Sequence, residues 1–287
     1  MKHKRIIIAV LLMVVFIFSS ISLIACNNND NESEQSNHNH NYIDDICEIC
    51  EQKCNMVFAL NSTTYTYNIT EYKGYDKTLT IPSAYNGKAV AGINANAFRG
   101  CIIPTKIIIP DSIKSINGFA FYDCSNLVNI SIPDSVKYIG AQAFDNTAWY
   151  ENQPDGVVYA GKFAYNYKGT MPQNTSLTLQ EGIVGIADRA FFEYTELVSI
   201  TIPDGVTTIN DSAFLGCTGL TSVSIPNSVT TIGPNVFYRC TALAHITFKG
   251  TKAEWKSIAH LDPWNSNISA FTVHCTDGDL NKYGYEI

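Results

Sequence analysis

The 287-residue sequence has little that would support catalysis or binding to nucleic acid. It contains six histidines, and the five after residue 25 lie in the N-terminal tail or in and just before the segment expected to cap the C-terminal end. No Ser-His-Asp order, phosphate-binding glycine loop or pair of carboxylates stands out, so an enzyme is not expected. Without residues 1–25 the chain has 16 Lys and Arg against 26 Asp and Glu, a formal charge of −10. An acidic chain without a basic cluster argues against nucleic acid or anionic lipid as the partner.

The first 25 residues are typical of a targeting segment. Three basic residues precede an apolar run, and residues 23–26 read Leu-Ile-Ala-Cys. These are the marks of a secretory signal, and the ending resembles a bacterial lipobox. That resemblance implies that residues 1–25 are a lipoprotein signal peptide and that Cys26 carries the lipid. An ordinary signal peptide and an uncleaved membrane-anchor helix are the alternatives. Residues 26–41 are polar and rich in Asn, which predicts a flexible tether.

Residues 42–55, with the histidines just before them, contain side chains that bind metals. Two cysteines separated by two residues can hold one zinc ion, and a further cysteine and a histidine would complete a tetrahedron. The segment resembles short Cys/His modules that precede repeats in some surface proteins. We therefore predict a structural zinc site, with a disulfide or free thiols as the alternatives in an exported chain. The predicted ligands are Cys47, Cys50 and Cys54 with either His38 or His40.

A repeat of 23 residues dominates the rest of the chain. The phrase Ile-Pro-Asp-Gly-Val at residues 202–206 returns as Ile-Pro-Asn-Ser-Val at residues 225–229, and an earlier pair begins at Ile109 and Ile132. A unit this short cannot bury its own apolar face, so its copies must stack as a solenoid. Within a unit we expect a short strand that ends at Pro, a second short strand and a tight, possibly helical turn. The turn contains an apolar pair at a fixed phase: Ala97-Phe98, Ala120-Phe121, Ala143-Phe144, Ala190-Phe191, Ala213-Phe214 and Val236-Phe237.

Four cysteines also occupy one phase of the repeat, four residues after the Ala of each pair. Same-phase residues of adjacent copies should lie about 5 Å apart, which is within disulfide reach. We expect a ladder of small buried thiols instead, because Thr147 and Tyr194 fill the same phase in the middle copies. The cysteines are Cys101, Cys124, Cys217 and Cys240.

The repeated wording from Ile200 to Leu220 resembles the BspA-like leucine-rich repeats of microbial surface proteins. The resemblance covers about residues 57–276. It implies a horseshoe-type leucine-rich repeat solenoid, mainly short β-strands with turns or short helices, with about six repeats of 23 residues and a cap at each end. We expect the solenoid with its N-terminal cap over residues 56–250 and the C-terminal cap over residues 251–287.

The repeat is broken once. The interval from Ala143 to Ala190 is 47 residues, which is two repeats plus one residue, and residues 147–174 replace the usual short link. Alternating apolar residues there predict a hairpin. Exposed aromatic side chains on a loop are typical of protein- and glycan-binding surfaces, whereas packing against the solenoid edge is the alternative. The candidate binding residues are Trp149, Tyr150, Tyr159, Tyr165 and Tyr167.

The resemblance implies a surface-displayed, lipid-anchored adhesion or recognition protein of a bacterial membrane. It would bind host or microbial proteins through its repeat face by several weak contacts. One alternative is a glycan- or solute-capture lipoprotein of an uptake system, and another is a structural spacer without a ligand. A flat polar sheet would favour adhesion, and a concave aromatic cluster with one deep pocket would favour capture.

Overall fold

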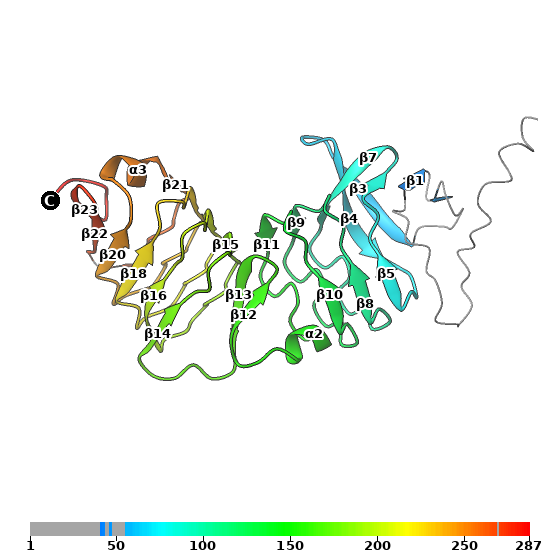
Figure 1. Ribbon diagram of the computed structural model, residues 1–287, viewed down its shortest axis with the longest axis horizontal. Coiled ribbons are helices and arrows are strands. Elements are labelled where there is room, and N and C mark those ends of the chain that lie inside the picture. Colours follow the sequence, from blue (N-terminus) through cyan, green and yellow to red (C-terminus); the bar gives the residue numbers. More distant parts are fainter. Residues whose placement is uncertain (1–40, 44–45, 48–54, 269) are drawn as a thin grey trace, which may run out of the picture.

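The computed structural model describes residues 41–43, 46–47, 55–268 and 270–287, with side chains from residue 55 onward. Over these residues the chain winds as a β-solenoid with little helix (Figure 1). Each regular turn contributes two short strands and a tight corner, and the stacked turns form four sheets in the described part of the chain. The solenoid predicted from the 23-residue period is confirmed.

One row of parallel strands, the first ladder, contains the strands that end at the Ile-Pro phase. It has an N-terminal and a C-terminal part, which form separate sheets. Apolar side chains such as Ile200 point into the core, and the neighbouring Ser199 points out. The N-terminal part is β5 (Thr78–Thr80), β8 (Lys106–Ile108) and β10 (Asn129–Ser131). The C-terminal part is β14 (Thr175–Thr178), β16 (Leu197–Thr201), β18 (Ser222–Ile225), β20 (His245–Phe248) and β22 (Thr272–Cys275), closed by the antiparallel β23 (Gly278–Asn281).

A second ladder of shorter strands forms another side of the solenoid. Its strands also pair in parallel with the copy 23 residues away, for example Ile209 with Ile232. The N-terminal part is β7 (Lys88–Ile93), β9 (Ser115–Ile116) and β11 (Tyr138–Ile139). The C-terminal part is β12 (Gly156–Ala160), β13 (Phe163–Lys168), β15 (Gly185–Ile186), β17 (Thr208–Ile209), β19 (Thr231–Ile232) and β21 (Ala259–His260).

The Ala-Phe corners are turns and not helices. In every copy the residue before Ala and the second residue after Phe have a positive φ, which interrupts a right-handed helix. Inside the corners the rings stack from copy to copy, with centroids 5.0–5.6 Å apart along Phe98, Phe121 and Phe144. The left-handed pairs are Asn96 and Gly100, Phe119 and Asp123, Gln142 and Asn146, Arg189 and Glu193, Ser212 and Gly216, and Asn235 and Arg239.

The cysteines at the fixed phase of the repeat also link neighbouring corners. The five cysteines with described side chains are free thiols. Each thiol of Cys124, Cys217 and Cys240 donates to the carbonyl of the Phe in the preceding copy, at 2.9–3.0 Å. Burial raises the pKa of Cys124 and Cys240 to about 12, so both remain protonated donors. The expected ladder of buried thiols is therefore present at these positions.

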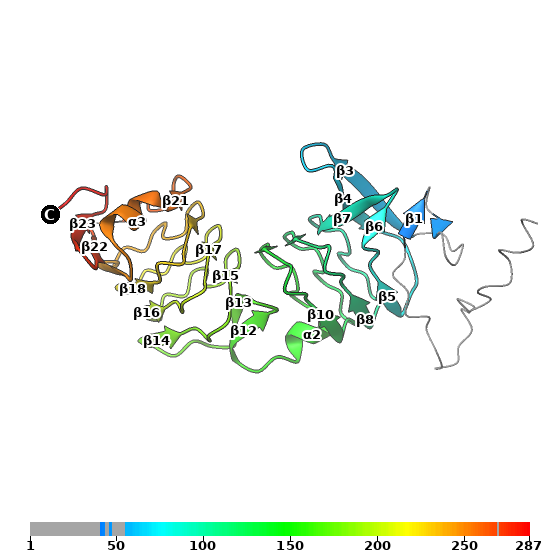
Figure 2. The same ribbon diagram turned by 45° about the horizontal axis from the view of Figure 1, so that its top comes forward.

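Both ends of the solenoid are covered. A hairpin of β3 (Met56–Asn61) and β4 (Thr66–Tyr72) stands out beside the first turn, and β4 pairs with β7 (Figure 2). Next to it, β6 (Ala84–Tyr85) pairs with β7 and with β1 (Asn41–Ile43), which pairs with β2 (Ile46–Cys47). At the other end, α3 (Lys252–Ser257) begins with a capping box and buries Trp255. Such covers protect the open strand edges of a stack.

Candidate functional site

The solenoid is interrupted between its two halves. Within the described residues β10 pairs only with β8, β12 only with β13, and β14 only with β16. In place of a first-ladder strand the chain forms the short helix α2 (Ala148–Glu151). Thr147, at the cysteine phase, caps this helix: its hydroxyl accepts from the Tyr150 N–H at 3.0 Å and donates to the Phe144 carbonyl at 2.7 Å. With β11, which pairs only with β9, four strands with one partner each therefore lie in the middle of the described part of the molecule.

The segment 147–174 is part of the solenoid wall. Its hairpin, β12–β13, is antiparallel, and β13 then pairs in parallel with β15 as a second-ladder strand. The N–H of Val184 donates to the Lys162 carbonyl at 2.8 Å, just as Lys137 donates to Lys114 in the preceding turns. The hairpin thus begins the C-terminal part of the second ladder, whereas β11, the last strand of the N-terminal part, pairs only with β9 among the described residues. A backbone hydrogen bond from the Asp188 N–H to the Ile139 carbonyl, at 3.1 Å, links the two parts.

Tyr165 provides the hydrogen-bond acceptor for Phe144, the last phenylalanine of the N-terminal corner stack. In regular corners the Phe N–H donates to the Ala carbonyl of the next copy, as Phe121 does to Ala143. The Phe144 N–H donates instead to the Tyr165 hydroxyl at 2.9 Å, and that hydroxyl donates to Asp145 Oδ1 at 2.6 Å. Tyr165 is 2 % exposed, so the prediction that it belongs to an exposed binding surface is wrong. Its ring packs in the core against Phe144, and its hydroxyl supplies the acceptor that the Ala carbonyl of a next copy would otherwise provide.

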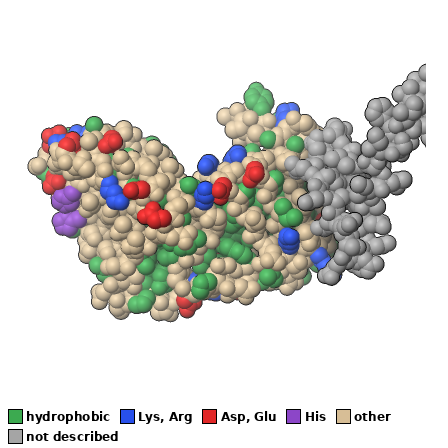
Figure 3. All heavy atoms as spheres, viewed as in Figure 1, with side chains coloured by type: hydrophobic (Ala, Val, Ile, Leu, Met, Phe, Trp, Pro, Cys, Tyr) green, Lys and Arg blue, Asp and Glu red, His purple; other side chains and the backbone are tan. Residues whose placement is uncertain are grey.

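The other four predicted aromatics are half-buried and have partners within the protein. Tyr159 accepts from the Gln180 N–H at 3.0 Å, and the Tyr167 carbonyl accepts from the Tyr194 hydroxyl. Trp149 packs edge-on against Phe144, and Tyr150 does so against Tyr165. All four pack against the hydrophobic core, which matches the packing alternative. Figure 3 shows apolar side chains at the surface around β12, β13 and β14.

A second tyrosine–aspartate pair lies at the same interruption. The Tyr138 hydroxyl donates to Asp188 Oδ2, while Asp188 Oδ1 is buried without a hydrogen-bond partner. Desolvation by burial raises the pKa of Asp188 to about 6, with a further increase from the nearby carboxylate of Asp211. Desolvation likewise raises the pKa of Asp145, against the lowering effect of the Tyr165 hydrogen bond. Each of these carboxyl groups lies between the N-terminal and C-terminal halves of the solenoid. Because burial disfavours the ionised form, each one lowers the free energy of unfolding near neutral pH.

We expect Asp188→Asn to flatten the dependence of stability on pH. The raised pKa means that the folded state binds this proton more tightly than the unfolded state does. The resulting stabilisation is present below pH 4 and is lost as the pH rises through about 6, a change of about 3 kcal/mol. Urea unfolding at pH 4–7 should show the variant as more stable than the wild type at pH 7. Asp111→Asn, at an exposed turn, is the matched control and should leave the profile unchanged. A wild-type slope retained in Asp188→Asn would contradict the assignment.

The outer face of the first ladder changes character along the molecule. In its C-terminal part the outward side chains are short and hydroxylated, and they align across strands, as Ser199 does with Ser176 and Ser222. The hydroxyls of Ser199 and Ser176 are hydrogen-bonded at 2.8 Å. The two outward columns of this polar face are Ser176, Ser199 and Ser222, and Thr178, Thr201, Ser224 and Thr247. At the N-terminal end the exposed residues include the apolar Ile102, Ile108 and Val128.

Several predicted sites lie outside the described part of the chain. These are the signal segment and the predicted metal ligands, apart from Cys47, which ends β2 and whose side chain is not described. Among the described residues, no group of three or more His, Cys, Asp or Glu is placed to hold a metal ion. The described part also contains no helix that is long and apolar enough to span a membrane. The residues outside it are Cys26, His38, His40, Cys50 and Cys54.

Comparison with known families identifies the repeat. A family described as BspA type Leucine rich repeat region matches residues 91–168 and 161–285, in six copies. The chain belongs to the BspA-type leucine-rich repeat family. Its members are built on a stacked scaffold of the kind that presents an extended surface to ligands. No curated protein matches the chain.

Solved structures that are similar to this chain include leucine-rich repeat proteins. One from T. pallidum has 24% identity, covering 66% of this chain and 88% of its own, with a TM-score of 0.39. A leucine rich cell surface protein from Faecalibacterium prausnitzii has 30% identity, covering 69% of this BspA-type chain and 54% of its own, with a TM-score of 0.36. One from Bacteroides ovatus has 23% identity, covering 72% and 65%, with a TM-score of 0.35.

Proposed function

We propose that this protein is a lipid-anchored adhesion or recognition protein displayed on a bacterial surface, and that it binds another protein through the polar face. The main support for the proposal is the strand register, which aligns the outward side chains of this face. Hydroxyl side chains repeat in two columns, and their strands lie about 4.8 Å apart. Short side chains at this spacing form a flat surface of donors and acceptors, which suits a broad protein partner.

The shape of the interruption is consistent with the same role. Strands with one partner and half-buried aromatics border the polar face, so an apolar area lies beside a polar one. Interfaces between proteins combine an aromatic or apolar centre with a polar rim. A lipid on Cys26 and the tether over residues 26–41 would hold this surface away from the membrane. The family's stacked scaffold also favours binding over catalysis.

A binding screen with surface variants tests the proposal. A soluble chain starting at residue 27 is screened against matrix proteins, bacterial surface proteins and glycans by biolayer interferometry. Ser199→Arg/Ser222→Arg, which places two long charged side chains on the polar face, should weaken binding to a protein ligand at least about tenfold. The control is Thr218→Arg/Thr241→Arg, at exposed turn positions of neighbouring repeats. It adds the same charge and should leave binding unchanged.

The alternatives give different results in the same screen. Binding to glycans alone would favour the capture function, and binding to nothing would favour the spacer. Equal loss in both double variants would mean that charge, and not the polar face, controls binding. Deleting residues 147–174 is unsuitable as a test, because β13 is part of the second ladder and Tyr165 is part of the core.

A further inference from the structure

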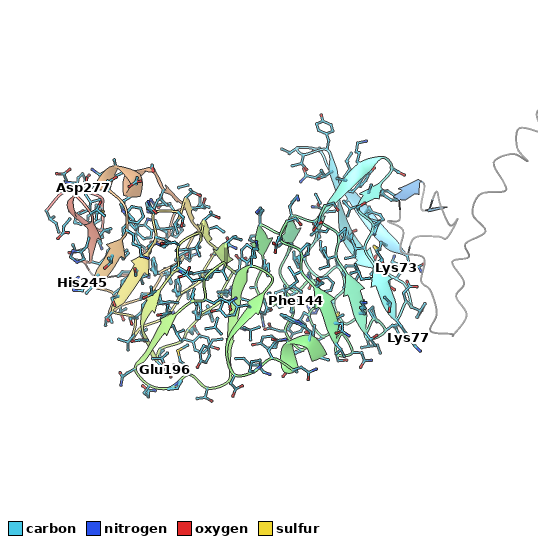
Figure 4. The ribbon with its side chains drawn as sticks, viewed as in Figure 1. Lys73, Lys77, Phe144, Glu196, His245 and Asp277 are labelled. Atoms are coloured by element: carbon cyan, nitrogen blue, oxygen red, sulfur yellow. The ribbon has the colours of Figure 1, made fainter. Side chains whose placement is uncertain are left out.

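Two histidines meet on the outer face of the first ladder at its C-terminal end. His245 lies on β20 and His274 on β22, which are adjacent parallel strands. His245 Nδ1 lies 3.0 Å from His274 Nε2, and the rings are stacked with centroids 5.2 Å apart and 27° between their planes. The pair is at the surface (Figures 3 and 4). His245 lies before residue 251, where the C-terminal cap was expected to begin, and it belongs to a repeat strand.

A carboxylate orients one of the rings. His274 Nδ1 lies 3.0 Å from Oδ1 of Asp279 on β23. A carboxylate accepts hydrogen bonds, so this contact places a proton on Nδ1 and leaves a lone pair on Nε2, the atom that faces His245. A carboxylate bound to the far nitrogen of a histidine is the arrangement that orients metal-bound imidazoles and makes them more basic.

We propose that His245 Nδ1 and His274 Nε2 form a binding site for a divalent transition-metal ion such as Zn²⁺, Ni²⁺ or Cu²⁺. Metal–imidazole bonds are about 2.0–2.1 Å long. Two nitrogens on one ion are therefore about 2.8–3.4 Å apart when the angle at the metal is between a right angle and the tetrahedral angle. The observed 3.0 Å lies within this window. Only small rotations of two surface rings would direct both lone pairs to one point.

The site would be open on its solvent side. No third His, Cys, Asp or Glu among the described residues is placed to complete it, so water or a group from a partner would occupy the other positions. The side chains of His274 and Asp279 are 39% and 43% exposed. When the metal binds, the proton of the His245–His274 hydrogen bond is replaced, and His245 carries its proton on Nε2. Because the ring is exposed, that exchange can proceed through solvent.

Metal titration of the full chain tests the site. The background variant Cys47→Ser/Cys50→Ser removes two of the three thiols of the predicted N-terminal zinc site. Isothermal titration with Ni²⁺ or Cu²⁺ should then show one site that is lost, or at least about tenfold weaker, in His245→Ala and in His274→Ala. Asp279→Asn should weaken binding about tenfold or more while keeping the stoichiometry. The control Thr247→Ala/Thr272→Ala alters the neighbours of the pair on the same two strands and should keep the affinity.

An NMR measurement separates a specific site from weak surface binding. Substoichiometric Ni²⁺ or Cu²⁺ should broaden the imidazole signals of His245 and His274 before those of the other histidines. Both rings are at the surface, so the alanine variants should keep the metal-free thermal midpoint of the parent, which circular dichroism checks. Unchanged affinity in both alanine variants, or prior broadening of His38, His40 or His260, would overturn the proposal.

Discussion

Replacing Phe191 with alanine is expected to lower the free energy of unfolding by about 3–5 kcal/mol. The ring is fully buried, and it stacks on Phe214 with centroids 5.4 Å apart and 8° between the planes. Phe214 stacks in the same way on Phe237 in the next copy. Truncation therefore leaves a cavity at the end of a continuous stack, and the rigid corner backbone around it can close only part of that cavity.

The neighbouring phenylalanine is the matched control. Phe192 is one residue away in the same corner, but it is half-buried and lies under the Arg189 guanidinium, 5.2 Å from the ring centroid. Phe192→Ala should cost less than about 1 kcal/mol. Urea unfolding followed by circular dichroism measures both variants. Similar losses for the two would show that the stack is not what holds the copies together.

The stack of phenylalanine rings could be predicted from the sequence because the 23-residue period directly determines which residues pack on one another. Residues 23 apart, such as Phe191 and Phe214, must lie in the same place in adjacent turns, and only the core accepts a recurring Phe. The corner geometry was less predictable. Its left-handed positions hold Arg189 and Glu193 in one copy and Ser212 and Gly216 in the next, so no residue type marks them.

The sequence predicted the interruption and its hairpin, but it did not predict that β13 is buried on both faces. Alternation suggested one buried and one exposed face for β13, yet Phe163, Ala164 and Tyr165 are all buried. Tyr165 packs into the core of the N-terminal half and Ala164 into that of the C-terminal half, so both faces of the strand are covered. A strand between two cores loses the alternating pattern that identifies a half-exposed one.

The histidine pair escaped prediction because it is out of period. His245 and His274 are 29 residues apart, so the 23-residue period does not predict that they are neighbours. The segment between β20 and β22, which contains α3 and β21, lengthens the interval between paired residues, and the two histidines are diagonal neighbours, since His245 pairs with Thr272 and His274 with Thr247. Strand pairing restores the alignment in space, and that pairing is visible only once the segment has folded.

Tyr165→Phe is expected to lower the free energy of unfolding by about 3 kcal/mol, although it removes a single oxygen atom. The change leaves the buried Phe144 N–H without its acceptor and removes a hydrogen bond to the Asp145 carboxylate. An unsatisfied buried donor costs about 1–3 kcal/mol, and a hydrogen bond to a charged group contributes about 1.5–3 kcal/mol. Tyr167→Phe, on the same strand, is the control, because Tyr167 contacts Tyr194 through its ring and its backbone carbonyl.

The loss caused by Tyr165→Phe should also depend on pH. The Tyr165 hydroxyl lowers the pKa of Asp145, which burial raises, so the variant raises that pKa further. At pH 7 the lost hydrogen bond is to a carboxylate, and at pH 4 more of the Asp145 population is a neutral acid, whose hydrogen bond is weaker. The difference between wild type and variant should therefore narrow as the pH falls from 7 to 4, measured by urea unfolding at each pH. A constant difference would mean that the hydroxyl stabilises the junction through Phe144 alone, and a loss equal to that of Tyr167→Phe would mean that it does not join the two halves.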